Sequence, residues 1–223
     1  MSATVIRSCL AITLTGLLLS LAWAQHGSFS GIVEDYSGEA AMLVAETRQS
    51  PIWFPVTLGQ GHLATDGSFE FELVTGEATP SEGVMPILEF FTSLGCETLK
   101  VSNDDATIFA VFDLRVLPEG ELEPFYAATL GTIYQASHPH NTVPRLGDFT
   151  VNRFCVNKEV TVTGTCSYAW GEQVYELELK EGWNTVVEEV AALEPATDLS
   201  DYMIVRSETR TLSEELHWFY RPF

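Results

Sequence analysis

Two histidines in one loop are the residues of this sequence with the clearest potential for chemistry. His138 and His140 flank Pro139, in a polar stretch that runs to Asp148. Neutral imidazole nitrogens are good ligands for zinc and copper, and this spacing could present both rings to one cation. Two ligands do not complete a site, and the sequence does not show a third. Two interpretations therefore stay open: a metal-binding or functional loop that uses His138 and His140, and an ordinary exposed loop, which we favour.

Cysteines are the second set of reactive residues. Cys9 lies in a segment that we expect to be removed, which leaves Cys96, Cys155 and Cys166. In an exported chain these three predict one disulfide and one spare thiol. A bond from Cys155 to Cys166 would place its midpoint inside a β-branched stretch and not in a turn. We therefore favour a disulfide between Cys96 and Cys166, linking the two halves of the chain, with Cys155 as a buried thiol. The spacing lacks C-x-x-C, which disfavours a metal site made of cysteines.

Acidic residues dominate the charge of the chain. Asp and Glu number 31 against 11 Lys and Arg, for a net charge of −20. Nucleic acid and anionic lipid surfaces are therefore unfavourable partners. A hydrolase needs only two carboxylates beside a cleft, so abundant acids do not discriminate. The sequence contains no G-x-S-x-G, H-E-x-x-H, phosphate-binding glycine loop or EF-hand spacing, which lowers the expectation of an enzyme without eliminating it. We expect no cofactor.

Residues 1–24 have the pattern of a secretory signal peptide. Arg7 precedes an apolar run from Leu10 to Ala22, and Ala22-Trp23-Ala24 forms an A-x-A cleavage site. The alternative is a retained membrane anchor, but the run is shorter than the roughly 20 residues that a span needs. We expect a secreted or periplasmic protein with no transmembrane segment in the mature chain.

A β-hairpin over residues 160–187 is the clearest structural element in the sequence. Its first arm, Val160 to Cys166, is rich in β-branched residues, and its second arm, Val174 to Val187, alternates apolar and charged residues. This period of two is typical of a half-buried strand. Residues 170–173 are polar and predict the loop between the arms. Gly182 predicts a bulge or turn, and Trp183 is expected to cap the core.

Most of the remaining chain also has strand patterns. Further strands are predicted over residues 29–33, 40–45, 51–58, 69–73, 108–116, 125–134, 149–156 and 201–210. Prolines 51 and 55 place the third of these at a sheet edge. Residues 85–94 fit either a short helix or an irregular strand. The aromatic residues of 212–220 are expected to pack on the second half, the alternative being an exposed patch that binds sugar.

The first half also resembles a known family. Gly31-Ile-Val33, the strand 40–45, and Thr65-Asp66-Gly67-Ser68-Phe69-Glu-Phe71 follow the G-x-V, A-x-V and T-x-x-D-G-x-F-x-F pattern. This stretch, roughly residues 28–75, looks like the carboxypeptidase regulatory-like, transthyretin-like β-sandwiches. The resemblance implies a sandwich with Phe69 and Phe71 in its core. It implies no active site, because these modules are mostly non-catalytic adhesion, scaffold or carbohydrate-associated domains. The whole chain also resembles small secreted bacterial β-proteins, for which no activity is implied.

These observations predict an all-β protein with two linked parts. We expect a signal peptide at 1–24, a transthyretin-like sandwich at 25–118, and a second antiparallel β-rich domain at 119–223; one continuous sandwich is the alternative. The predicted function is a non-catalytic exported protein that binds a protein or carbohydrate partner or contributes to the cell envelope. Two alternatives remain: a secreted hydrolase with an acidic pair in the cleft between the halves, and a metal-binding protein that uses His138 and His140.

Overall fold

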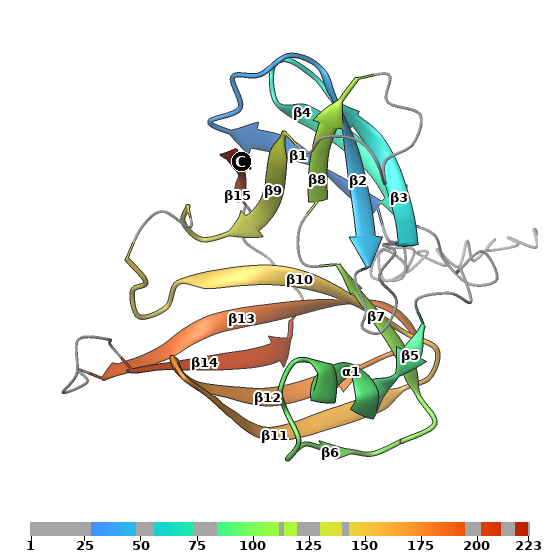
Figure 1. The fold of residues 1–223 in the computed structure, drawn as a ribbon, viewed down its shortest axis with the longest axis vertical. Coiled ribbons are helices and arrows are strands. Elements are labelled where there is room, and N and C mark those ends of the chain that lie inside the picture. The colour runs from blue at the N-terminus through green and yellow to red at the C-terminus, as the bar shows by residue number, and fades with distance from the viewer. Residues whose placement is uncertain are drawn as a thin grey trace, which may run out of the picture.

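The computed structural model describes residues 28–47, 56–73, 84–111, 114–119, 130–139, 143–194, 202–210 and 217–222. These residues form fifteen strands in one connected sheet and a single short helix, so the predicted all-β class is confirmed. The strands divide into two groups that Figure 1 shows one above the other, with β10 between them.

Seven strands form the upper group. They are β1 (Ser28–Glu34), β2 (Ala41–Thr47), β3 (Val56–Leu63), β4 (Ser68–Leu73), β8 (Leu114–Pro118), β9 (Gly131–Ala136) and β15 (His217–Pro222). They pair in the order β15-β1-β4-β3-β2-β8-β9, and β9 also pairs with β15. We call this group the ring, because its pairings close and leave none of these strands with an unpaired side. The transthyretin-like assignment of this half stays a prediction.

The lower group is a curled sheet with the helix across it. It contains β5 (Met85–Pro86), α1 (Ile87–Ser93), β6 (Lys100–Val101), β7 (Thr107–Val111), β10 (Phe149–Val156), β11 (Val160–Tyr168), β12 (Gly171–Leu179), β13 (Gly182–Glu194) and β14 (Tyr202–Thr209). The strand order is β10-β13-β14-β12-β11-β6, and β7 pairs with β10 and β5. We call this group the curled sheet. Within the described part of the chain, no helix is long and apolar enough to cross a bilayer.

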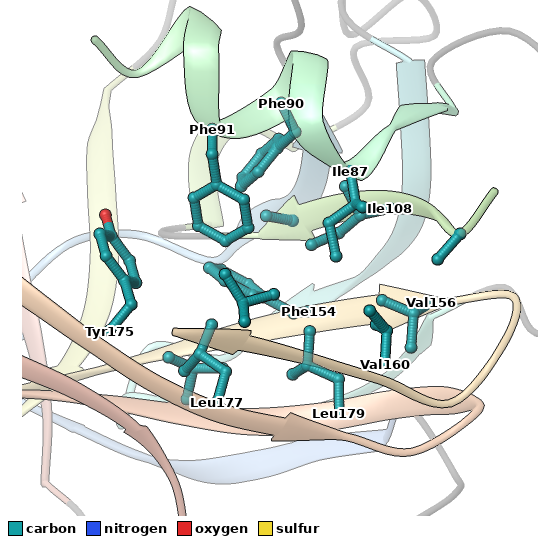
Figure 2. Packing of buried hydrophobic residues seen from close by; sticks show 14 of the residues in the cluster. Ile87, Phe90, Phe91, Ile108, Phe154, Val156, Val160, Tyr175, Leu177 and Leu179 are labelled. Carbon is teal, nitrogen blue, oxygen red and sulfur yellow. The ribbon is translucent and has the colours of Figure 1, made fainter. Parts of the chain in front are cut away.

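Each group has its own hydrophobic core. In the curled sheet, α1 lays Phe90 and Phe91 over Phe154 and Leu177, all of which are buried (Figure 2). Phe90 meets Phe154 edge to face at 5.7 Å between ring centroids, a favoured arrangement of aromatic pairs. Pro86 directly precedes α1, where a missing backbone N–H costs nothing, so residues 85–94 form a short strand followed by a helix.

Strand β10 contributes to both cores. Phe154 and Val156 face the core of the curled sheet, whereas Cys155, between them, faces the core of the ring. This follows from the alternation of side chains along a strand. On the neighbouring strand β13, Trp183 also enters the ring core, where it contacts Phe109 edge to face at 5.0 Å. The two groups therefore share the layer formed by β7, β10 and β13.

The predicted hairpin is present as β11 and β12, with a tighter loop and an earlier end than expected. Its alternation is confirmed, because Tyr175, Leu177 and Leu179 are buried. The predicted loop at 170–173 is too long, since β12 already begins at Gly171. The predicted second arm is also too long, because the chain turns after Leu179.

Strand β13 then leaves the hairpin altogether. Gly182 has φ 92°, and the Asn184 side chain closes the turn by accepting a hydrogen bond from the Lys180 N–H at 2.8 Å. Strand β13 pairs with β10 and β14, and β14 runs parallel to β12 on its other side.

Two other strand predictions need correction. The long strand predicted over 108–116 is two strands, because β7 pairs with β10 while β8 pairs with β2 and β9. The edge position predicted from prolines 51 and 55 is wrong for β3, which lies between β2 and β4. Strand β3 begins at Val56, so no proline interrupts its ladder. Residues 51–55 lie outside the described part of the chain.

The last strand brings the end of the chain to the ring. Trp218 is buried in the ring core against Phe69, and Phe219 packs near Tyr134. The prediction that these aromatics pack on the second half therefore holds for Phe219 but is wrong for Trp218. The buried positions of both rings favour core packing over an exposed sugar-binding patch.

The predicted boundary at residue 118 does not coincide with the two groups. Strands β9 and β15 follow this boundary and complete the ring, whereas β5, α1, β6 and β7 precede it and belong to the curled sheet. The reason is that long-range pairing exchanges strands between the two halves of the sequence. Whether the chain has two separate folding domains stays a prediction.

Candidate binding cavity

A cavity of about 300 Å³ lies at one end of the curled sheet. We call it the end cavity. Its polar floor contains Gln173 of β12 and Glu188 of β13, and its walls are largely apolar. The apolar lining residues are Phe149, Val190, Met203 and Val205, together with Pro139 and Pro144. The first turn of the chain after β9, the loop before β10 and the turn between β11 and β12 form its rim.

Gln173 holds the floor together. Its side-chain nitrogen donates one hydrogen bond to Glu188 Oε1 at 2.8 Å and another to Ser207 Oγ at 2.8 Å. The three side chains meet because β13, β14 and β12 are neighbours in the sheet, in registers that place Val205 beside Val190 and Gln173. Ser207 is fully buried. The floor is therefore a preformed polar cluster, in which Gln173 fixes the orientation of the carboxylate.

Glu188 has an environment that disfavours its charge. Burial raises the pKa of the Glu188 carboxyl above its ordinary value, and hydrogen bonds from Gln173 and Asn152 partly oppose this effect. The side chain lies deep in the protein but stays partly accessible, because it borders the cavity. A cationic group placed in the cavity would favour the carboxylate form.

A buried amide beside this floor is incompletely satisfied. Asn152 is 4% exposed, and its side-chain nitrogen has no hydrogen-bond partner of good geometry among the described residues. It lies on β10 two residues after Thr150, which lines the cavity, and therefore on the same face of the strand. An unsatisfied buried donor costs about 1–3 kcal/mol, and such costs in native proteins are concentrated at functional sites.

The rim beside β9 and β10 is built by a loop with many internal hydrogen bonds. The Asp148 carboxylate accepts a hydrogen bond from the Arg145 N–H at 2.8 Å, and its other oxygen lies 3.6 Å from His138 Nε2. Ser137 Oγ accepts from the Phe149 N–H at 2.8 Å. These bonds fix the carboxylate of Asp148 at the mouth of the cavity.

Trp170 forms the opposite rim. Its ring is stacked on that of Tyr168, with centroids 4.9 Å apart and planes within 8°, and 40% of the residue is exposed. The Trp170 carbonyl accepts a hydrogen bond from the Met203 N–H at 3.1 Å. The stacking and the hydrogen bond hold a large aromatic surface at the cavity mouth.

The predicted metal loop lies partly in view. His138 lines the end cavity, whereas His140 lies outside the described part of the chain. Among the described residues, no group of three His, Cys, Asp or Glu side chains is arranged to hold a metal ion. Metal binding by His138 and His140 stays a prediction.

The cysteines follow the pairing that the sequence favours. Cys96 and Cys166 form a disulfide, with Cα atoms 5.2 Å apart. Cys155 is a buried free thiol, and burial raises its pKa to about 12. Such a thiol stays protonated at neutral pH and is a poor nucleophile.

Sequence reasoning misses the residues that form the floor. It places Gln173 in a hairpin loop and does not separate Glu188 from the other acids. A signal is present in both cases: Gln173 shares the alternation of Tyr175 and Leu177, and Glu188 shares that of Val186 and Val190. A polar residue on the apolar face of a strand indicates a buried partner or a site.

Comparison with known proteins gave no match, whether with family models, with curated proteins or with solved structures. The function must therefore be argued from the chemistry of the site.

Proposed function

We propose that this chain is an exported, non-catalytic binding protein and that the end cavity is its ligand site. The observation that carries this proposal is the combination of a preformed polar floor, Gln173 with Glu188, and apolar walls in one cavity. Small-molecule sites in proteins typically have this composition, with a few well-placed polar groups in an apolar pocket. A role in the cell envelope remains compatible with such a site.

Rigidity of the floor supports binding. Gln173 contacts both Glu188 and Ser207, so the carboxylate is oriented before a ligand arrives. Preorganisation of this kind reduces the entropy lost on association. Trp170 and Met203 add aromatic and thioether surface at the mouth, which are suited to contact with a ligand.

A ligand screen tests this proposal. The mature protein is screened by ligand-observed NMR against a fragment library that contains amines, acids, alcohols and saccharides. Ligands of the end cavity should lose at least about tenfold in affinity in Glu188→Gln and in Trp170→Ala, because these residues line it. Glu178→Gln, at an exposed position of β12, is the matched control and should retain binding. Hits that bind all four proteins equally would show that the ligand site lies elsewhere.

A hydrolase is the second candidate, because Asp148 and Glu188 line the same cavity. A carboxyl whose pKa is raised by burial is suited to act as a general acid, with a second carboxylate as its partner. This pair lies within the second half of the chain and not in a cleft between the halves. Turnover of a chromogenic glycoside panel that is abolished in both Glu188→Gln and Asp148→Asn would replace the binding proposal with this one.

Export is part of the proposal and rests on the signal-like N-terminus alone. N-terminal sequencing of the protein recovered from the periplasm or the medium should begin at Gln25, after the A-x-A site. Recovery of an intact N-terminus in the membrane fraction would favour the retained anchor instead.

A further inference from the structure

We propose that the end cavity selects a small organic cation, with an ammonium group that meets Glu188 and an apolar body that contacts the walls. This inference rests on the proposed function, because it names the ligand class of the same site. It goes beyond it in predicting the charge of the ligand.

The charges that line the cavity favour a cation. Two carboxylates, Asp148 and Glu188, border it, and its lining among the described residues includes no Lys or Arg. His138 is the one lining residue that could become positive, and it lies at the rim beside Asp148. An anionic ligand would meet like charges here, whereas a cation would supply the counter-charge that a buried carboxylate lacks.

The nearest basic residue on β10 does not supply that charge. Arg153 lies on the same face as Cys155, which is turned towards the ring, and donates a hydrogen bond to Gln135 Oε1 at 3.0 Å. Gln173 provides Glu188 with a neutral hydrogen bond only. A carboxylate has about four acceptor positions, so an ammonium group can still donate to it.

The aromatic rim provides independent support for a cation. Tyr168 stacks on Trp170 with planes within 8°, which holds the indole ring in place at the mouth. Indole faces attract ammonium groups by about 0.5–2 kcal/mol. Met203, Val190 and Phe149 complete an apolar wall for the remainder of the ligand. An aromatic rim, an apolar wall and a carboxylate floor together fit an amine with a hydrophobic substituent.

Size and long-range charge agree with this assignment. A volume of about 300 Å³ lies at the lower limit of small-molecule pockets, which favours a compact ligand. The net charge of −20 raises the local concentration of cations and opposes the approach of anions.

The test compares three probes of nearly equal shape and different charge. Benzylamine, benzyl alcohol and benzoate are titrated into the mature protein by calorimetry at about pH 7.5 and about 0.15 M salt, where screening limits non-specific attraction. We expect benzylamine, which is protonated at this pH, to bind at least about tenfold more tightly than benzyl alcohol, and benzoate to bind most weakly. In Glu188→Gln the preference for benzylamine should disappear, whereas in Glu178→Gln it should persist.

The outcomes separate this inference from the proposed function. Equal or tighter binding of benzyl alcohol would overturn the inference of a cation and leave the cavity as a site for neutral ligands. A preference for benzylamine that survives in Glu188→Gln would also overturn it, since net charge alone would then explain the selectivity. Trp170→Ala, at an exposed position, should weaken benzylamine binding at least about threefold. It provides a second test if Glu188→Gln does not fold.

Discussion

At the scale of single residues, the end cavity depends on Glu188 and its hydrogen-bond partner. Gln173 and Glu188 belong to different strands, and each lies on the buried face of its own strand. Burying a carboxylate is costly unless it is paired, so retaining one here lowers stability at the site. Sites that trade stability for function commonly show this kind of local conflict.

The raised pKa of Glu188 predicts a specific dependence of stability on pH. A folded-state pKa above the unfolded value means that the folded protein holds a proton that the unfolded chain has lost. The contribution of Glu188 to stability therefore falls as pH rises from its unfolded pKa through its folded pKa. Each tenfold difference in proton affinity between the two states corresponds to about 1.4 kcal/mol. Glu188→Gln removes this loss, so its unfolding free energy relative to the wild type should increase with pH across this window in urea titrations.

Other titrating groups near the cavity, Asp148, His138 and Tyr175, are present in both proteins and cancel in this comparison. Glu178→Gln is the control and should show no such increase, because Glu178 is exposed. A difference between Glu188→Gln and the wild type that does not change between about pH 4 and about pH 9 would contradict the assignment of Glu188 as a destabilised carboxyl.

At the scale of elements, the cavity exists because β14 lies between β12 and β13. Strand β12 ends at Leu179 and β13 begins at Gly182, yet the two strands separate, and β14 pairs with both. The start of β12 is close to β14, since Gly171 pairs with Met203 and both Trp170 and Met203 border the cavity. Close approach of these strands requires a residue without a side chain at Gly171.

Two glycines with positive φ provide a matched comparison. A Cβ at Gly171 (φ +146°) would overlap the backbone of Met203, whereas a Cβ at Gly147 (φ +86°) would meet nothing within 4 Å. Both alanine variants incur the strain of a positive φ, about 1–2 kcal/mol. Gly171→Ala should cost about 1–3 kcal/mol more, because the strands must also move apart. Urea unfolding followed by circular dichroism measures both values, and equal costs would contradict the close strand packing.

At the scale of the whole molecule, the disulfide stabilises one core and not the junction of the two groups. Cys96 and Cys166 are 70 residues apart, but both belong to the core of the curled sheet. The sequence correctly predicts a link between the first half and the second, and the structure shows that residues 84–111 already lie in the curled sheet. The bond therefore holds the segment after α1 against β11.

Reduction of this bond should lower the unfolding free energy by about 4 kcal/mol, the loop-closure value for a loop of this length. Urea titrations with and without reductant measure the effect. The double variant Cys96→Ala/Cys166→Ala is the control, because reductant should not change its stability. Cys155 should react with a thiol reagent only after unfolding, since it is buried and protonated. A wild-type stability that is unchanged by reductant would contradict the disulfide.

The sequence by itself determined the all-β class, the alternation of the β11–β12 hairpin, the turn at Gly182 and the choice of Cys96 with Cys166. These features depend on residues that are close in the chain or on simple restrictions of turn geometry. The sequence also places a charged residue, Glu188, on the apolar face of a strand, although the pattern alone does not reveal what that residue meets.

Only the tertiary structure decided which strands became neighbours. The pairing of β15 with β1 and β9 closes the ring, and the parallel insertion of β14 brings Gln173 to Glu188 and Ser207, which are 15 and 34 residues away. A period of two shows which face of a strand is buried but not the strand beside it. The partner is selected by the total burial of apolar surface and by the hydrogen bonds between distant segments. The end cavity is therefore a product of long-range pairing.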